Sequence, residues 1–238
     1  MKKYSYLFLL VLIALGSSAH AAESEFDGAY VGVNLGYANG DSKGTSYCNG
    51  NDNECPKGEP SYFYANPGIN SELIGGFVGF NKRINNNTLL GLEADYEFRN
   101  GHKRSFENII DGEGDADDVD YQVGSKFKNS ASIRAKLGYL LNNNQSLIYA
   151  TGGLSLLKMK NTYSKTGDNF SETHSNWHSG WTAGLGLEHF VNSKLSIKGE
   201  YRYSDFAHKT DNISEYEEEY KVRVDSEHSV RLGIAYHF

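Results

Sequence analysis

The sequence lacks any long hydrophobic run. No segment of the 238 residues approaches the roughly 18 consecutive apolar residues that mark a membrane-spanning helix. Proline is also scarce, with three residues, whereas there are 26 glycines, 17 tyrosines and 12 phenylalanines. These features exclude a helical integral membrane protein. They do not exclude membrane-spanning β-strands, because only alternate side chains of such a strand need to be apolar.

Positively charged residues are fewer than negatively charged ones. The chain has 23 lysines and arginines against 30 aspartates and glutamates, which gives a formal net charge of −7 with neutral histidines. An acidic surface repels the phosphate backbone of DNA and RNA. The composition therefore argues against nucleic acid as a partner.

The first 21 residues have the pattern of a secretory signal peptide. Lys2 and Lys3 supply the positive start, residues 7–15 form a short apolar core, and Ala-His-Ala at 19–21 is a small-x-small cleavage site. The alternative, an anchor helix, needs a longer apolar run. We therefore expect residues 22–238 to form the mature domain. Cleavage removes two lysines and no acid, which changes the formal net charge from −7 to −9.

The chain has only two cysteines, Cys48 and Cys55, in a polar stretch rich in glycine, asparagine and aspartate. In an exported protein, an isolated pair of nearby cysteines is most simply a disulfide. The alternative is a cysteine-based metal site, but the C-x-x-C spacing and a second ligand pair are missing. We predict a Cys48–Cys55 disulfide.

Alternating apolar and polar side chains characterise the C-terminal segment. Because successive side chains of a strand point to opposite faces, this segment is a strand with one apolar face. Its apolar row consists of Val230, Leu232, Ile234, Tyr236 and Phe238. Seven earlier segments alternate in the same way, at about 29–37, 72–83, 90–98, 130–139, 146–160, 181–188 and 195–204. The second segment is rich in glycine. In the fifth segment, the pattern does not show which alternate residues face outward after Gly152-Gly153.

The connections between these segments alternate between short and long. Asparagine-rich turns lie near 85–87, 142–144 and 192–193, while the stretches 40–70, 100–127, 160–176 and 207–226 are long. Short periplasmic turns alternating with long outer loops are typical of transmembrane barrels. The strands of a soluble β-sandwich also alternate in hydrophobicity. That fold does not explain why charged residues lie in the middle of several strands and all on one face. The sequence predicts an all-β fold, an eight-stranded antiparallel up-and-down transmembrane β-barrel.

The inward faces of the predicted strands carry charges of both signs. An eight-stranded barrel is narrow and is filled by side chains. Buried ions are costly unless they are paired, so we expect these charges to neutralise one another across the lumen. We expect the network to have mainly a structural role, as a plug of the lumen, and less a role as a functional site. The predicted lumen charge network is Glu93, Asp95, Arg134, Lys136, Glu188, Glu200, Arg202 and Arg231, with Glu97 and Lys198 also facing inward.

Several segments carry a family resemblance: 180–188, 195–203 and 230–238, with further similarity at 91–96 and 149–154. They resemble the small outer-membrane β-barrels often labelled "porin family", which are related to the transmembrane domain of outer membrane protein A. The resemblance implies a Gram-negative outer-membrane protein with extracellular loops and periplasmic termini. It also implies insertion by the barrel assembly machinery, which reads a terminal aromatic residue, here Phe238. Members of the family include surface antigens, adhesins and some haem-binding receptors.

Other candidate sites are weak. Segment 111–120 holds six acids, and oxygen ligands suit Ca²⁺, but the glycine and the terminal glutamate of a calcium loop are missing. Tyrosines in segment 215–220, at Tyr47 and in 62–64 suit protein recognition. No nucleophile elbow is present. Five histidines without a motif could bind haem or a metal: His174, His178, His189, His208 and His228.

We therefore expect a structural and surface-interaction role without catalysis, cofactor or metal. Envelope integrity, adhesion or surface antigenicity would depend on the outer loops. The expected partners are outer-membrane lipids, lipopolysaccharide, the assembly machinery and a host-cell surface. The alternative function is a narrow porin or a haem-binding receptor.

Overall fold

The structure is a computed structural model that describes residues 26–47, 60–101, 104–107, 121–141, 144–165, 171–207, 209–213 and 218–238. Every regular element in these ranges is a strand, and none of the described residues forms a helix long and apolar enough to cross a membrane. The strands are β1 (Gly28–Tyr47), β2 (Pro60–Arg83), β3 (Thr88–Gly101), β4 (Arg104–Glu107), β5 (Tyr121–Leu141), β6 (Ser146–Lys165), β7 (Ser171–Phe190), β8 (Leu195–Phe206), β9 (Lys209–Ile213) and β10 (Glu218–His237).

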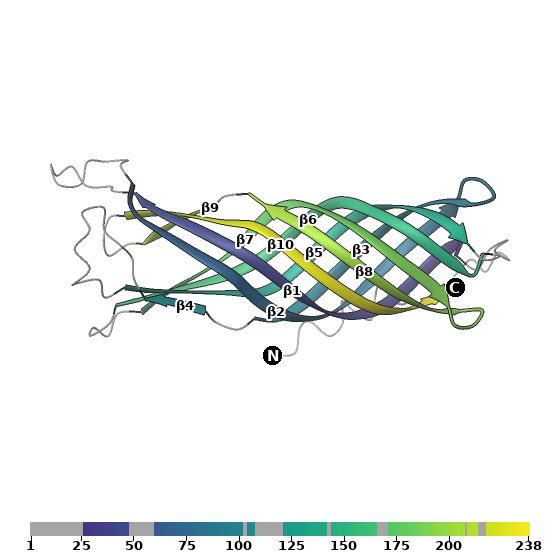
Figure 1. Cartoon of the computed structure of the whole chain (residues 1–238), viewed down its shortest axis with the longest axis horizontal. Coiled ribbons are helices and arrows are strands. Elements are labelled where there is room, and N and C mark those ends of the chain that lie inside the picture. The colour runs from purple at the N-terminus through teal and green to yellow at the C-terminus, as the bar shows by residue number, and fades with distance from the viewer. Residues whose placement is uncertain are drawn as a thin grey trace, which may run out of the picture.

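These strands form one closed antiparallel sheet. The order is β1-β2-β3-β5-β6-β7-β8-β10, and β1 also pairs with β10, which closes the barrel. Strand β4 pairs with β5 and continues β3 along it, while β9 pairs with β10 and continues β8. Figure 1 shows the strands running obliquely around a long cylinder. The predicted eight-stranded antiparallel barrel is confirmed.

The outward face carries the apolar rows. Leu92, Ile133 and Ile197 are all exposed, as expected for side chains that face lipid. On β6, Leu154 and Leu156 are exposed while Leu157 is buried, so the outward parity continues past the two glycines. Aromatic side chains border this apolar belt at both ends, as in membrane barrels; they include Tyr37, Tyr96, Phe98, Trp181 and Tyr201 at one end and Phe80, Tyr139, Tyr236 and Phe238 at the other.

One end of the barrel has three short turns, and the C-terminus lies at this end (Figure 1). Asparagine shapes two of them. The Asn85 Oδ1 accepts hydrogen bonds from the backbone nitrogens of Asn87 and Thr88, at 3.1 and 2.9 Å. The Asn192 Oδ1 accepts from Lys194 and Leu195 at 3.0 and 2.9 Å. Asparagine favours such turns because its side chain replaces a backbone acceptor. The predicted short turns are confirmed.

The predicted long loops are wrong in their extent. Strands occupy much of 40–70, 100–127, 160–176 and 207–226; β2, for example, begins at Pro60 and has 24 residues. A membrane-spanning β-strand needs only about 9–11 residues. Beyond the bilayer the outer face of the sheet contacts water instead of lipid, so the outward row of apolar side chains ends. The sequence pattern therefore ended where the lipid ends, and not where the strands end.

Several predicted features lie outside the described residues. They are the signal peptide 1–21, Cys48, Cys55, the acidic segment 111–120 and His208. Of the segment 215–220, only the backbone of the last three residues is described, and the side chains of Tyr47 and 62–64 are not. The disulfide and the signal peptide stay predictions.

Candidate functional site: the ion-paired lumen

The inside of the barrel is lined by charged side chains that come from facing strands. Strand alternation directs them inward, between outward-facing apolar residues. The structure places all eight residues of the predicted network there, together with Glu97 and Lys198, and each of the ten charged side chains is buried or nearly so. It also brings oppositely charged members into contact.

Arg134 on β5 lies at the middle of this lumen. Its Nη2 is 2.6 Å from Glu93 Oε1 and 2.8 Å from Asp95 Oδ2, both on the neighbouring β3. Its Nη1 is 2.8 Å from Glu200 Oε1 on β8, which is separated from β5 by two further strands. The Arg134 Nε donates to Ser132 Oγ at 3.0 Å. One guanidinium therefore connects the two sides of the barrel.

Glu93 collects several positive partners. Lys198 Nζ reaches its two carboxylate oxygens at 2.9 and 2.8 Å from the opposite wall. Lys136 Nζ lies 3.5 Å from Oε2, and the Tyr30 hydroxyl donates to the same oxygen at 2.8 Å. With Arg134, three cations and one hydroxyl surround a single buried carboxylate. Charge-assisted hydrogen bonds of this kind offset the desolvation of the ions.

A second carboxylate, Glu188, lies nearer the short turns. Its Oε2 is 3.4 Å from Lys136 Nζ, and its Oε1 accepts from Ser196 Oγ at 2.6 Å and lies 3.1 Å from His237 Nε2. The Lys136 ammonium also lies 4.6 Å from the centre of the Tyr149 ring, within the range of a cation–π contact. The lysine is therefore held by both charge and ring.

A further layer of ion pairs lies toward the other end. Arg231 contacts Glu97 through two hydrogen bonds, of 2.6 and 3.0 Å. Arg99 on β3 makes a bidentate pair with Glu227 on β10, across the lumen. The sequence prediction missed Arg99 and Glu227, because each lies just beyond the expected end of its strand. Continuing the same inward parity by one step would have found them.

Arg202 belongs to the same layer as Arg134. Its Nη1 is 3.3 Å from Asp95 Oδ1, and its Nη2 is 2.8 Å from Glu200 Oε1. Asp95 and Glu200 also bind Arg134, so the two guanidinium groups share both carboxylates. The buried charges therefore form connected clusters instead of isolated pairs, one around Arg134 and one around Glu97.

Apolar side chains cover the charges at the end with the short turns. The carbonyl of Phe26, two residues before β1, accepts from Asn81 Nδ2 at 3.1 Å, which ties this segment to the inside of the barrel. The Phe26 ring lies 4.4 Å from the ring of Phe190. The buried cluster consists of Phe26, Leu89, Leu140, Leu147, Tyr149 and Phe190. The lumen is thus filled by apolar side chains below the ionic layers.

Comparison with known proteins decides what kind of barrel this is. Residues 8–238 match the family described as outer membrane protein beta-barrel domain. The chain belongs to this family. The 31 kDa outer-membrane immunogenic protein of Brucella melitensis is 29% identical over 221 residues, which cover 89% of this chain and 83% of that protein. The 22 kDa outer membrane protein of Rhizobium leguminosarum is 32% identical over 116 residues, 49% of this chain and 50% of that one.

Two solved structures of outer-membrane barrels share the fold. The protease OmpT of Escherichia coli has a TM-score of 0.52 at 12% identity, covering 93% of this chain and 100% of OmpT. OprG of Pseudomonas aeruginosa has a TM-score of 0.51 at 13% identity, covering 90% of this chain and 98% of OprG. At such identities the likeness concerns the fold alone.

Family membership and the exposed apolar belt make this protein an integral outer-membrane protein in a lipid environment, with a surface and structural role. In barrels of the outer membrane the short turns face the periplasm. Phe238 lies at this end, half exposed, where its backbone nitrogen donates to Ala29 O at 3.1 Å. Its recognition by the assembly machinery stays a prediction.

The described histidines belong to two strands, β7 and β10. His174 and His178 both lie within β7. His189 faces outward beside Ser146 Oγ (2.9 Å), and His228 lies beside Tyr201 OH (2.6 Å). Within the described ranges, no three His, Cys, Asp or Glu side chains come together to hold a metal ion.

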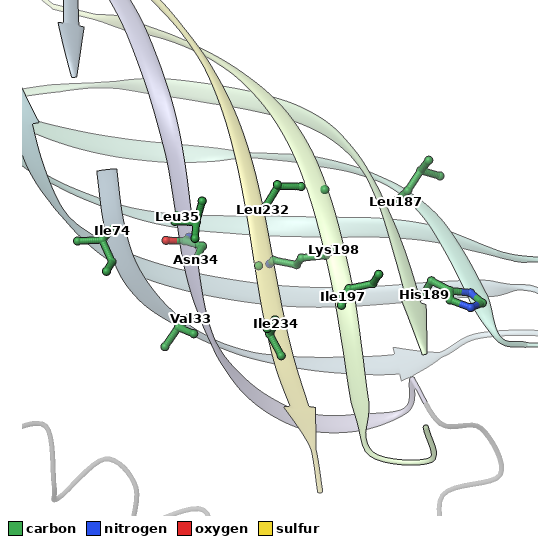
Figure 2. A pocket seen from close by; sticks show the side chains of 12 residues that line it. Val33, Asn34, Leu35, Ile74, Leu187, His189, Ile197, Lys198, Leu232 and Ile234 are labelled. Carbon is green, nitrogen blue, oxygen red and sulfur yellow. The ribbon is translucent and has the colours of Figure 1, made fainter. Parts of the chain in front are cut away.

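A shallow hollow interrupts the lipid-facing wall of the barrel. Figure 2 shows apolar side chains around it, from β1, β2, β7, β8 and β10. The hollow exists because Gly199 takes an outward position without a side chain, between Ile197 and Leu232. Its walls are continuous with the apolar belt, so hydrocarbon chains of the bilayer are its natural filling. We do not assign it a soluble ligand.

Proposed function

We propose that this protein is a closed, non-catalytic anchor in the outer membrane that holds its outer segments above the lipid for contact with other surfaces. The observation that carries the proposal is the lumen, in which Arg134 bridges β3 and β8 and Lys198 reaches back to Glu93. The carboxylates there are engaged by cations, which leaves them poorly suited to general acid–base chemistry. The pairing supports a stabilising plug.

The length of the sheet supports display of the outer segments. The 24 residues of β2 span about 60 Å along the barrel axis at a rise of about 3.3 Å per residue and a tilt of about 40°. The apolar band of a membrane barrel is only about 25 Å tall. Much of the strand therefore projects beyond the lipid. Two relatives are named immunogenic outer-membrane proteins, which agrees with contact between this exposed part and host surfaces or antibodies.

Replacing the outer connections tests the proposal. We expect substitution of residues 48–59, 108–120, 166–170 and 214–217 by short Gly-Ser linkers to leave an inserted barrel and an unchanged envelope permeability. Binding of whole cells to host-derived matrix and to antisera should fall several-fold, because the contact surface is removed. The measurements are a cell-binding assay and uptake of an excluded antibiotic, scored separately. Replacement of the periplasmic turn 85–87 is the control. Unchanged binding with increased permeability would contradict the display role.

The closed lumen predicts a low conductance. In a planar bilayer, the refolded protein should show no steady open level, since ion pairs and the Phe26 cluster obstruct the path at successive levels. A porin of about 16–18 strands, which encloses an aqueous channel, serves as the positive control. A stable open state of the unmodified protein would favour the narrow-porin function instead.

A further inference from the structure

Four lysines gather on the outer wall of the barrel, where β5 and β6 leave the apolar belt. Lys126 and Lys160 are directly paired across the two strands, and Lys158 is paired with Asn129. The register shifts between Phe127 and Asn129, so that Lys128 is the extra residue of a β-bulge. We call the four residues the lysine cluster: Lys126, Lys128, Lys158 and Lys160.

The alternation of burial shows the direction of these side chains. Met159, between Lys158 and Lys160, is fully buried in the lumen, and Phe127, next to Lys126, is buried as well. The lysines adjoining them therefore point away from the lumen, toward the surroundings of the barrel. They are half-buried along their length. Lysine stems that lie along a surface in this way still present the ammonium group to solvent or headgroups.

The lysine cluster begins where the lipid-facing row ends. On β6 the outward residues Leu154 and Leu156 are exposed apolar side chains, and Lys158 is the next outward residue. A step of two residues is about 7 Å, which is the distance from hydrocarbon into the headgroup layer. Trp177 on β7 is paired with Lys158, and the lysine Nζ lies 5.8 Å from the ring centre. Tryptophan is typical of this interface.

In the described part of the chain, the positive charge of this sector has no acidic partner. Among the described residues, no ion pair is formed by any member of the lysine cluster. Like charges directly opposite each other on a sheet destabilise it, as at the Lys126–Lys160 pair. Elsewhere around the barrel, the outward positions just above the belt carry acids instead: Asp41 on β1, Glu72 on β2 and Asp205 on β8. In a chain of net charge −7, four clustered cations form a local site that favours an external anion.

We propose that the lysine cluster binds the phosphate groups of anionic lipids in the outer leaflet of the outer membrane. The acyl chains of such a lipid would lie against Leu154 and Leu156, and its phosphates would lie between the ammonium groups above them. Lysine is a suitable ligand for phosphate, because its ammonium group acts as a point charge on a flexible side chain. The proposal commits to a lipid because the cluster is continuous with the lipid-facing wall. It is independent of whether the lumen conducts.

The two tryptophans of the chain report on this sector directly. Trp177 is paired with Lys158, and Trp181 is paired with Leu154. Quenching of their fluorescence by lipids with brominated acyl chains measures which lipid occupies the adjoining surface. We would reconstitute the full refolded protein in phosphatidylcholine vesicles that contain brominated phosphatidic acid, which has a phosphate monoester headgroup. Brominated phosphatidylcholine at the same fraction is the reference lipid.

We expect about a fivefold preference for phosphatidic acid at low salt, which corresponds to about 1 kcal/mol. The double variant Lys158→Gln/Lys160→Gln should reduce this ratio to near one, and Lys158→Arg/Lys160→Arg should keep it. The matched control is Lys82→Gln/Lys194→Gln, which removes the same charge at the periplasmic end and should keep the preference. To show that each variant is folded, we would check that it stays folded in unheated detergent, as is expected of the unmodified barrel.

The proposal is overturned if the unmodified protein shows no preference, or if the Lys158→Gln/Lys160→Gln variant retains it. A third outcome separates a protein partner from a lipid. If polyglutamate binds the detergent-solubilised protein with the same dependence on the two lysines while the vesicles show no lipid preference, the cluster is a docking surface for acidic proteins. That result also rejects the lipid site.

Discussion

Replacing Arg134 by methionine is expected to lower the free energy of unfolding by about 3–5 kcal/mol. The side chain is fully buried, and its guanidinium contacts Glu93, Asp95 and Glu200 at 2.6–2.8 Å. Methionine fills a similar volume but leaves these carboxylates with fewer cationic partners inside the barrel. The cost therefore arises from buried carboxylates that have lost one of their cationic partners. Urea unfolding in vesicles, followed by tryptophan fluorescence, measures the change.

The control for this prediction is a lysine in an exposed ion pair. Lys82 lies 3.5 Å from Asp27 at the periplasmic end, and its side chain is 68% exposed. Replacing Lys82 by methionine should change the free energy of unfolding by less than about 1 kcal/mol, because water screens such pairs. If the Arg134 variant were no less stable than the Lys82 variant, the connected cluster around Arg134 would not be what stabilises the lumen.

The parts of the structure that could be predicted from sequence are those that a boundary with lipid imposes. Leu92 and Glu93 illustrate the reason: a strand with hydrocarbon on one side and a packed polar lumen on the other must alternate at every residue. The eight strands and the inward charges followed from this constraint. So did the short turns, because asparagine has a specific role at Asn85 and Asn192.

The parts of the structure that could not be predicted depend on contacts between strands, which the sequence of a single strand does not determine. The pairing of Lys198 with Glu93 joins residues 105 positions apart and requires the closed register of the barrel. Above the bilayer the alternation of hydrophobicity ends, so the strand residues Arg99 and Glu227 were missed. The lysine cluster was hidden for the same reason. Lys126 lies in a segment predicted as a loop and Lys160 at the end of a predicted strand, and only the register of β5 and β6 places them together.

Because lipid contact determines the outward row, a charge placed in that row should be strongly unfavourable. Leu185 on β7 is 66% exposed and lies between Ala183 and Leu187 in the apolar belt. We expect Leu185→Arg to lower the free energy of unfolding in vesicles by about 2–4 kcal/mol, the cost of arginine near the middle of a bilayer. In a water-soluble protein an exposed leucine tolerates this change within about 0.5 kcal/mol.

The same strand provides the matched control. Ser175 is also outward and exposed on β7, but it lies beyond Trp177 on the extracellular side of the belt. Ser175→Arg should therefore cost at most about 1 kcal/mol, from repulsion by Lys160 on the paired strand β6, since the added charge lies outside the hydrocarbon. The two variants carry the same substituent on the same face of one strand at different depths. Equal effects at the two positions would mean that the apolar rows do not contact hydrocarbon; a large difference locates the edge of the bilayer between Leu185 and Ser175.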